Sequence, residues 1–404
     1  MKDQTLVVGG GLGGLTTALA LARDGRQVRV LEGAPAFGAI GYGIQFGPNV
    51  FHALARIGVA DAILAKADFP PALLMFDALT GHEVTRVPTG PSLRARFHYP
   101  YIVIHRVDLH NALLDGCRSN PLITLEPEAM VSRFTDDGDR VTVTTDDGRS
   151  FQGDLLIGAD GIRSRTRMQM FADGDPRPNG YMGFRTVVPM GEVTGDVRRD
   201  IVALWAGPGF HMVHYPLRRG TLFNLVAVFR RTANFERGDA AAYRAELEHA
   251  YRNAHPTMKA LLSMLDLGRR QAVGDRDPVR HWHKGRVVLL GDAAHPTLQS
   301  LAQGACMAIE DGVCLADCLA ADGDHQSAFR RYETARGLRT ARVTLESRYI
   351  WDVYHSDGID REVYWQMLGE RNEADTFQCL AWLYDGFALP EEAGRDRSAA
   401  KTSG

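Results

Sequence analysis

A glycine-rich turn near the start of the chain constrains its fold more than any other feature. The turn lies between the apolar run Thr5 to Val8 and an alanine- and leucine-rich run from Leu15 to Arg23. A strand, a glycine turn and a helix in this order bring backbone N–H groups and a helix N-terminus to the pyrophosphate of a dinucleotide. The candidate cofactor-binding residues of this turn are Gly9, Gly11, Leu12 and Gly14. The sequence therefore predicts an α/β unit that binds a dinucleotide.

An acidic residue at the end of the next strand narrows the choice of dinucleotide. Val28 to Glu32 reads as a second parallel strand, and Glu32 ends it 18 residues after Gly14. A carboxylate in this place can accept hydrogen bonds from a ribose hydroxyl, which favours an adenosine ribose without a phosphate. A glycine pattern alone leaves dinucleotide binding open, whereas the strand, the helix and the acid together favour it.

A second glycine motif, Gly158-Ala159-Asp160-Gly161, follows the predicted strand Phe151 to Leu156 and opens a helix. Asp160 is a candidate cofactor-binding residue. The alternative is a turn that merely starts a helix, with Ser164 in the first helical turn.

A third motif begins at Gly291-Asp292, after the apolar strand Gly285 to Leu290, and leads into a helix from about Gly304. Asp292 can hold a polyol hydroxyl, and the helix start can direct N–H groups at a flavin and stabilise negative charge on it. The candidate residues at the helix start are Gln303, Gly304 and Ala305. The three motifs in this order predict an FAD site.

Composition excludes several other classes of protein. The chain has 404 residues and a formal net charge of −3, which gives no basis for nucleic-acid binding, and no basic cluster suggests a membrane surface. No apolar stretch is long enough to span a bilayer. Five cysteines without paired spacing, and no leader pattern ahead of the first strand, predict a reducing, cytoplasmic location. The pair His281 and His283 has no third ligand nearby, so we expect no metal site.

Nearly the whole chain resembles the single-component (group A) FAD-dependent aromatic hydroxylases. Gly41 to Asn49, which contains Gln45, resembles the loop over the flavin, and Ile104 to Leu109 resembles the segment whose arginine, here Arg106, reaches the cofactor. The resemblance implies FAD as cofactor, NADH or NADPH as a transient electron donor, O2, and a flavin hydroperoxide that hydroxylates a small aromatic acid. Tyr42 replaces the small residue expected in the loop, which leaves the movement of the flavin open.

Between about residues 180 and 270 the pattern changes to alternating strands, which predicts an antiparallel sheet. In the run from His211 to Tyr215, the two-residue period places His211, Val213 and Tyr215 on one face, with Met212 and His214 on the other. If the first face is turned to the flavin, His211 offers a base. From spacing alone, a surface histidine is the alternative.

Residues 207–218 and 292–311 resemble the corresponding segments of 3-hydroxybenzoate 6-hydroxylases, which form gentisate. The resemblance implies that His211 deprotonates the substrate phenol, Gln299 hydrogen-bonds near the phenol oxygen, Tyr215 orients the ring and Asp77 lines the pocket. A phenolate delivers electron density to its para carbon, and neutral imidazole can accept the proton near neutral pH. Arg185 is a candidate for the substrate carboxylate, with an exposed arginine as the alternative. A salicylate 1-hydroxylase that forms catechol and a non-catalytic FAD-binding scaffold remain open.

The order of segments predicts a glutathione-reductase-like FAD-binding Rossmann domain, a substrate domain built on an antiparallel sheet, and a C-terminal helical region. The predicted ranges are 1–68, 98–175 and 270–345 for the FAD-binding domain, 69–97 and 176–269 for the substrate-binding domain, 346–385 for the helical region and 386–404 for a mobile tail. Aromatic residues of the helical region, such as Trp351 and Trp365, leave open a pocket cap, a homodimer contact or ordinary core packing.

Overall fold

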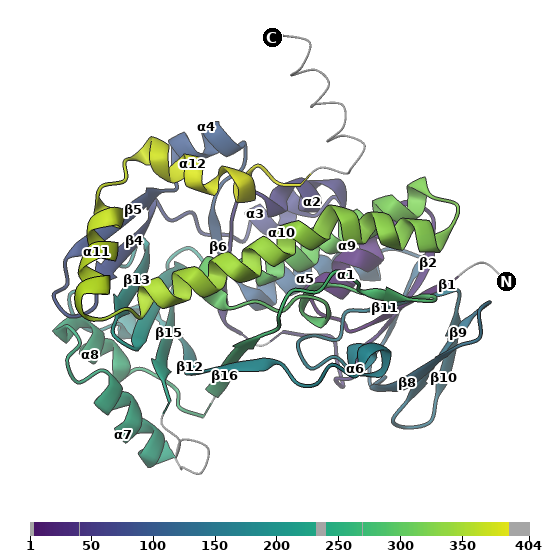
Figure 1. Cartoon of the computed structure of the whole chain (residues 1–404), viewed down its shortest axis with the longest axis horizontal. Helices are drawn as coiled ribbons and strands as arrows, with labels where there is room; N and C mark the ends of the chain where they lie inside the picture. Colours follow the sequence, from purple (N-terminus) through teal and green to yellow (C-terminus); the bar gives the residue numbers. More distant parts are fainter. Residues whose placement is uncertain (1–3, 40, 232–239, 269, 388–404) are drawn as a thin grey trace, which may run out of the picture.

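The computed structural model describes residues 4–39, 41–231, 240–268 and 270–387, so the predicted tail lies almost wholly outside the described residues. Two large sheets form separate layers, and the long helix α10 (His325–Tyr354) crosses the front of both (Figure 1). The predicted α/β class, with a Rossmann FAD-binding part, a sheet-based part and a helical C-terminal region, is confirmed.

The first sheet is the parallel sheet that the glycine motifs predicted. Its six strands run in the order β17-β18-β11-β1-β2-β7, and only β17 is antiparallel to its neighbour. Their bounds are β1 (Gln4–Val8), β2 (Gln27–Leu31), β7 (Ile123–Glu126), β11 (Leu155–Gly158), β17 (His283–Lys284) and β18 (Val287–Leu289). The three glycine motifs follow β1, β11 and β18, which are neighbours, and so meet at one edge of the sheet.

The helix that follows the first glycine turn packs against two other helices. The α1 helix (Leu12–Arg23) is buried along most of its length and packs between α5 (Arg106–Arg118) and α9 (Gly304–Ala321). Its alanine- and leucine-rich composition suits this close packing. The α9 helix also carries Cys314 and Cys318, both buried as free thiols.

The second sheet has seven strands in the order β16-β12-β15-β14-β13-β4-β5. All neighbouring pairs are antiparallel except β13 and β4, which are parallel, so the predicted antiparallel sheet contains one parallel pair. The strands are β4 (Ala72–Asp77), β5 (Glu83–Pro88), β12 (Arg177–Pro189), β13 (Val202–Gly207), β14 (Phe210–Leu217), β15 (Leu222–Arg230) and β16 (Arg270–Asp275).

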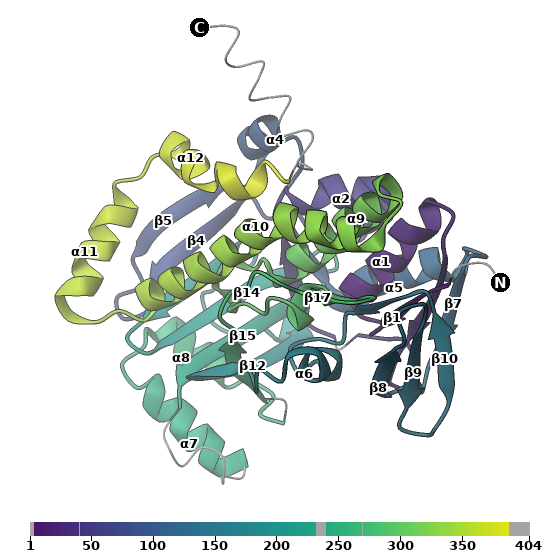
Figure 2. The same cartoon turned by 45° about the vertical axis from the view of Figure 1, so that its right-hand side comes forward.

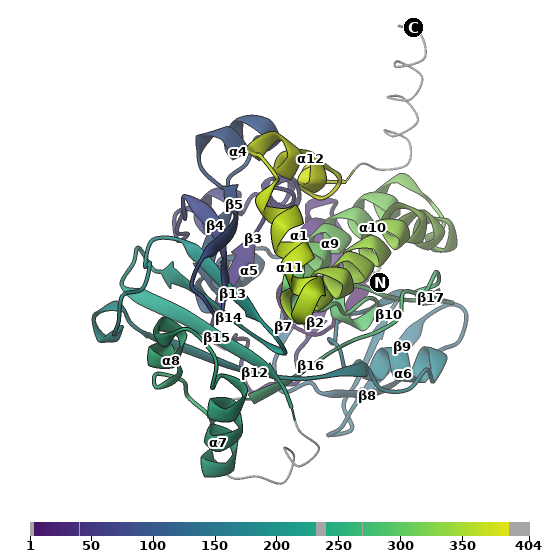
Figure 3. The same cartoon turned by 60° about the vertical axis from the view of Figure 1, so that its left-hand side comes forward.

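Two helices cover the outer face of this sheet, and the C-terminal part of α10 packs against its inner face through Trp351. The α7 (Ala240–Ala250) and α8 (Pro256–Leu262) helices lie on its outer side (Figure 3), over a core that includes Met212. On the opposite face, Tyr215 joins the core of the FAD-binding part. His214 lies on the outer side with Met212, where its Nε2 accepts a hydrogen bond of 3.1 Å from the Trp205 indole. The alternation predicted for β14 is therefore confirmed.

The remaining elements frame the two large sheets. A three-stranded sheet, β10-β9-β8, lies at the edge of the FAD-binding part (Figure 2), and β3 pairs with β6. These strands are β3 (Gly43–Phe46), β6 (Ile102–His105), β8 (Val131–Asp136), β9 (Val141–Thr145) and β10 (Ser150–Gly153). The other helices are α2 (Val50–Arg56), α3 (Ala60–Leu64), α4 (Pro91–Phe97), α6 (Arg165–Phe171), α11 (Gly358–Gly369) and α12 (Glu373–Tyr384), together with short 3₁₀ turns at 190–192, 291–293 and 299–301. No helix in the described ranges is long and apolar enough to cross a membrane.

Two elements cross the predicted domain ranges. The β16 strand falls within the range assigned to FAD binding, yet it pairs with β12 in the seven-stranded sheet. The α10 helix continues past residue 345 to Tyr354, so the FAD-binding part and the helical region share one helix. The division into domains stays a prediction.

Buried ion pairs join α9 to α10. The Arg336 guanidinium is fully buried and lies 2.7 Å from both Glu310 Oε2 and Asp311 Oδ1. Asp311 also contacts His295 at 2.6 Å, which ties the third glycine motif to the same network. Although burial acts to raise the pKa of Asp311, His295 and Arg336 lower it to about 2. Through Asp311, the network ties the middle of α9 to the turn that carries Asp292.

Candidate active site

The first glycine turn has the geometry that a bound diphosphate requires. Gly9 has a φ of +105°, and a Cβ atom on Gly14 would lie 1.9 Å from the Gly9 carbonyl oxygen, so neither position tolerates a side chain. At Gly11, by contrast, an added Cβ would meet nothing within 4 Å. Gly11 is also the N-cap of α1, and no side chain caps the first N–H groups of this helix there. This cradle fits the phosphates of FAD.

Glu32 lies beside this cradle, as the sequence predicts. Its Oε2 accepts a hydrogen bond of 2.7 Å from the Gly10 N–H, and its Oε1 accepts one of 2.8 Å from the Ala34 N–H. These contacts hold the carboxylate at the end of β2, next to the turn. Its contact with a ribose stays a prediction.

The third motif presents a free carboxylate and a helix N-terminus. Asp292 lies in a hollow, with protein atoms around its carboxylate, but it remains accessible to solvent. It accepts no hydrogen bond from a described residue. Burial raises the pKa of Asp292, against the nearby charges of His295 and Arg106. Gln303 caps α9 without a side-chain bond to the helix, and the Asn49 amide donates to its Oε1 at 3.0 Å. Gly304 and Ala305 form the open first turn, which leaves N–H donors for a cofactor.

The contacts of Asp160 are those of a residue that starts a helix, which is the alternative to a cofactor-binding role. Its Oδ1 accepts from the Ser164 hydroxyl at 2.5 Å, and its Oδ2 accepts from the Thr166 N–H and hydroxyl at 3.0 Å. Ser164 in turn caps α6 through the Arg167 N–H. The motif thus starts α6 at the edge of the sheet, and a direct contact of Asp160 with FAD stays a prediction.

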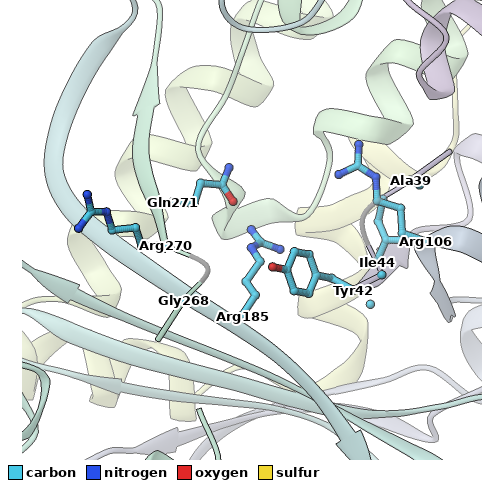
Figure 4. Close-up of a pocket in the computed structure, with 10 residues that line it drawn as sticks. Ala39, Tyr42, Ile44, Arg106, Arg185, Gly268, Arg270 and Gln271 are labelled. Carbon is cyan, nitrogen blue, oxygen red and sulfur yellow. The ribbon is translucent and has the colours of Figure 1, made fainter. Parts of the chain in front are cut away.

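A cavity of about 810 Å³ opens between the flavin loop and the seven-stranded sheet. It is lined by Ala39, Gly41, Tyr42, Gly43, Ile44, Arg106, Arg185, Gly268, Arg270 and Gln271. In Figure 4 the Tyr42 hydroxyl is turned toward the Arg185 guanidinium, while the Arg270 guanidinium is turned away from both. The Tyr42 side chain therefore stands in the cavity itself, and its effect on flavin movement stays a prediction.

Arg185 is one of the arginines that line this cavity. It lies on β12, and its side chain donates a hydrogen bond to Gln299 Oε1. No carboxylate of the described residues pairs with Arg185. Burial lowers the pKa of Arg185. Because the Gln299 oxygen faces an arginine, its NH2 group remains available as a donor.

His211 lies on the same face of the sheet as Arg185. The β14 register pairs His211 with Val228 on β15, and Arg185 pairs with Val226 on the same strand. The His211 side chain is buried, its Nδ1 lies 2.8 Å from His355 Nε2, and its ring meets the Trp351 ring edge-on. Burial lowers the pKa of His211 well below its usual value, and the neighbouring His355 and Arg185 lower it further. The histidine is therefore neutral near pH 7 and can act as a base.

Tyr215 and Gln45 meet where the sheet touches the flavin loop. A Cβ atom on Gly43 would lie 2.4 Å from the Tyr215 ring, so glycine is required there for the loop to reach the sheet. The Tyr215 hydroxyl interacts with Gln45, whose Oε1 also accepts from the Tyr101 hydroxyl at 2.6 Å. Both residues thus lie next to the cavity wall, and their roles toward substrate and flavin stay predictions.

Asp77 lies on the same sheet face, two strands away from His211, but its carboxylate is already engaged. It accepts from the Leu79 and Thr80 N–H groups at 2.8 and 3.0 Å and from the Trp365 indole at 2.9 Å, and it pairs with Arg361. These bonds close the turn after β4 and anchor α11. No described residue of the cavity contacts Asp77, and a role in substrate binding stays a prediction.

The sequence did not predict the position of two residues of the site. The sequence gives His355 no functional role, because nothing in it indicates that the end of α10 meets β14. For Arg185 the sequence left a carboxylate-binding residue and an exposed arginine both open, and in the structure Arg185 lines the cavity. His281 and His283, in contrast, both contact Glu333, which gives these histidines a structural partner.

Comparison with known proteins bears on this geometry. The family model described as "FAD binding domain" matches residues 2–347. The chain belongs to this FAD binding domain family. The 3-hydroxybenzoate 6-hydroxylase of Klebsiella oxytoca is 40% identical over 382 residues, which are 94% of this chain and 96% of the relative. The 6-hydroxynicotinate 3-monooxygenase of Bordetella bronchiseptica is 34% identical over 346 residues, 85% of this chain and 90% of the relative.

Solved structures agree with the fold. Klebsiella pneumoniae HpxO in complex with FAD and uric acid aligns with a TM-score of 0.83 at 28% identity, over 95% of this chain and 97% of that one. This chain is therefore an FAD-dependent aromatic monooxygenase, and the predicted family and cofactor are confirmed. The glycine cradle, the open carboxylate of Asp292 and the uncapped start of α9 are the features of this chain that fit FAD.

Proposed function

We propose that this monooxygenase hydroxylates 3-hydroxybenzoate at the carbon para to its phenol and releases gentisate. NADH or NADPH serves as electron donor and O2 as oxidant, and bound FAD supplies the redox chemistry. A base and a cation on one sheet face, His211 and Arg185, are the observation that carries the proposal. The 40% identity to 3-hydroxybenzoate 6-hydroxylase over almost the full length of both chains supports the choice of substrate.

In this proposal His211 takes the phenol proton. The phenol O–H bond breaks, an N–H bond forms at Nε2, and the electron pair stays on the phenolate oxygen, which enriches the para carbon. The Gln299 NH2 group donates to the phenolate oxygen, and Tyr215 holds the ring against the flavin loop. Arg185 binds the substrate carboxylate, the anion that this half-buried guanidinium lacks among the described residues.

Product analysis tests the reaction. Purified holoenzyme is given NADH or NADPH with 3-hydroxybenzoate, salicylate or 6-hydroxynicotinate, and the products are separated by chromatography. We expect gentisate from 3-hydroxybenzoate. Catechol from salicylate, with no gentisate, would transfer the function to decarboxylative hydroxylation. If no aromatic acid stimulates oxidation of either nucleotide, the protein is not a hydroxylase of these acids and the non-catalytic scaffold gains support.

Substitution of the base tests the mechanism. We predict that His211→Ala lowers kcat about 10²- to 10⁴-fold, the usual contribution of a positioned base, while FAD stays bound. His214→Gln is the matched control, because His214 is on the same strand but faces the opposite side of the sheet, against Trp205. The measurements are steady-state turnover and the visible flavin spectrum. Equal turnover in His211→Ala and the control would remove His211 from the reaction.

A further inference from the structure

His355 lies directly behind the proposed base. It follows α10 as its C-cap, and its Nε2 lies 2.8 Å from His211 Nδ1. Its own Nδ1 lies 2.7 Å from the backbone carbonyl oxygen of Trp351. The rings of His211 and His355 are 4.9 Å apart between centroids, and the Trp351 ring packs against both. The chain thus connects a helix carbonyl to the base through one histidine.

The carbonyl fixes the direction of both hydrogen bonds. A carbonyl oxygen only accepts, so the His355 Nδ1 must carry the proton. In a neutral imidazole the other nitrogen is then a lone-pair acceptor. His355 Nε2 therefore accepts from His211, and the proton of His211 must sit on Nδ1. The Nε2 of His211 keeps its lone pair and makes no hydrogen bond to any described residue.

The surroundings keep both rings neutral. The charged groups that face the pair are cations, Arg185 from β12 toward His211 and Arg230 from β15 toward His355. Tyr354 from α10 lies against His211, and Tyr181 from β12 lies against His355. No carboxylate in the described ranges pairs with either ring. Burial, with a smaller effect from Arg230, lowers the pKa of His355 to about 3 against the bond to Trp351.

We propose that His355 is a positioning residue that selects the Nδ1–H tautomer of His211 and so reserves Nε2 for the phenol proton of the substrate. This inference rests on the proposed function. When the phenol O–H bond breaks and Nε2 gains the proton, His211 becomes an imidazolium whose Nδ1–H still donates to His355. His355 itself neither gains nor loses a proton in this step.

Without an acceptor at position 355, both neutral tautomers of His211 become populated and its ring is free to turn. Outer partners that fix a histidine tautomer typically contribute about 10- to 100-fold to activity. We therefore expect His355→Leu to lower kcat with 3-hydroxybenzoate about 10- to 100-fold. His355→Gln places an amide oxygen where Nε2 was, so we expect it to recover most of this loss.

The decisive readout is the ionisation of the bound phenol, which a merely structural role would not change. Ultraviolet difference spectra of 3-hydroxybenzoate bound to the oxidised holoenzyme give the phenolate fraction as a function of pH. We expect a lower phenolate fraction in His355→Leu at neutral pH, an acid limb of kcat/KM moved to higher pH, and a smaller defect with a fluorinated 3-hydroxybenzoate whose phenol is more acidic. His355→Gln should resemble the wild type in all three measurements.

The outcomes separate this inference from the proposed function. Unchanged phenolate spectra and pH profiles in His355→Leu, alongside gentisate formation that His211→Ala abolishes, would overturn the role of His355 alone. Absence of gentisate from the wild type would overturn both. If His355→Leu does not give folded holoenzyme, the tautomer is read in the unmodified protein from ¹⁵N-histidine NMR, with the signals of His211 assigned by their loss in His211→Ala. A pyridine-type Nε2 supports the inference, and a protonated Nε2 in the neutral ring overturns it.

Discussion

At the scale of single residues, Arg185 makes the strongest prediction about which substrates bind. Its guanidinium lies in the cavity, and its side-chain hydrogen-bond partner among the described residues, Gln299, is uncharged. A hydrogen bond to a charged group contributes about 1.5 to 3 kcal/mol, which corresponds to roughly 10- to 100-fold in affinity. We therefore predict that Arg185→Gln raises KM for 3-hydroxybenzoate by about this factor and changes kcat less.

Arg270→Gln is the matched control for this substitution. Arg270 lines the same cavity, but its guanidinium is turned away from Arg185 (Figure 4) and stacks on the Tyr243 ring, 4.6 Å from its centroid. Initial rates over a range of substrate concentrations give KM for both variants. The uncharged analogue 3-hydroxybenzamide should bind to the wild type and to Arg185→Gln with similar affinity. An unchanged KM for the acid in Arg185→Gln would show that the carboxylate binds elsewhere.

At the scale of elements, substitutions in the turn between β1 and α1 should affect cofactor binding and folding differently. A methyl group at Gly11 meets no described atom within 4 Å, whereas one at Gly14 would collide with the Gly9 carbonyl oxygen. We predict that Gly11→Ala folds like the wild type but binds FAD more weakly, because its methyl group occupies the space that the phosphates approach. Gly14→Ala should reduce the yield of folded protein itself.

A glycine in the middle of α10 provides the control for the turn. Gly337 has open space around its Cα, and alanine there should stabilise the protein by about 0.5 to 1 kcal/mol because helical glycine is unfavourable. FAD affinity by fluorescence titration and the unfolding of the apoprotein in urea are measured for all three variants. Equal FAD affinity in Gly11→Ala and Gly337→Ala would contradict the proposed position of the phosphates.

Local patterns predicted these elements well because each motif carries its own physical reason. The glycine turn requires positive φ and close packing, and the two-residue alternation in β14 by itself places His211 and His214 on opposite faces.

What the sequence could not predict depends on contacts between distant segments. The parallel pairing of β13 with β4, the bond from Arg185 to Gln299 and the meeting of His355 with His211 join residues far apart in the chain. Asp77 illustrates the same gap, since its engagement by Trp365 and Arg361 depends on where α11 packs.

At the scale of the whole molecule, buried neutral histidines make stability depend on pH. Burial lowers the pKa of His214 to about 3 and, with a smaller effect from Arg230, that of His355 to about 3, and burial lowers the pKa of His211 well below its usual value. In the unfolded chain each of these histidines has a pKa of about 6.5. Below that pH the unfolded state binds more protons than the folded state, so acid favours unfolding.

The contribution of these histidines to the free energy of unfolding should therefore be constant above about pH 6.5. It should fall as the pH drops toward 3. Each of the histidines contributes up to about 1.4 kcal/mol per pH unit in this window. Ordinary carboxylates titrate mainly below about pH 4.5, so histidines dominate the slope between pH 6 and 5. Urea unfolding of the holoenzyme at a fixed, saturating FAD concentration measures this slope.

His214→Gln isolates one of these contributions. Its amide oxygen can still accept from the Trp205 indole, but the side chain no longer titrates. We predict that the slope of unfolding free energy against pH falls by up to about 1.4 kcal/mol per pH unit in this variant. Leu225→Val, a buried residue paired with His214 on β15, should lower stability by about 1 kcal/mol equally at both ends of the range. If His214→Gln keeps the wild-type slope, His214 is protonated in the folded protein or stays neutral in both states, and the loss of stability in acid has another origin.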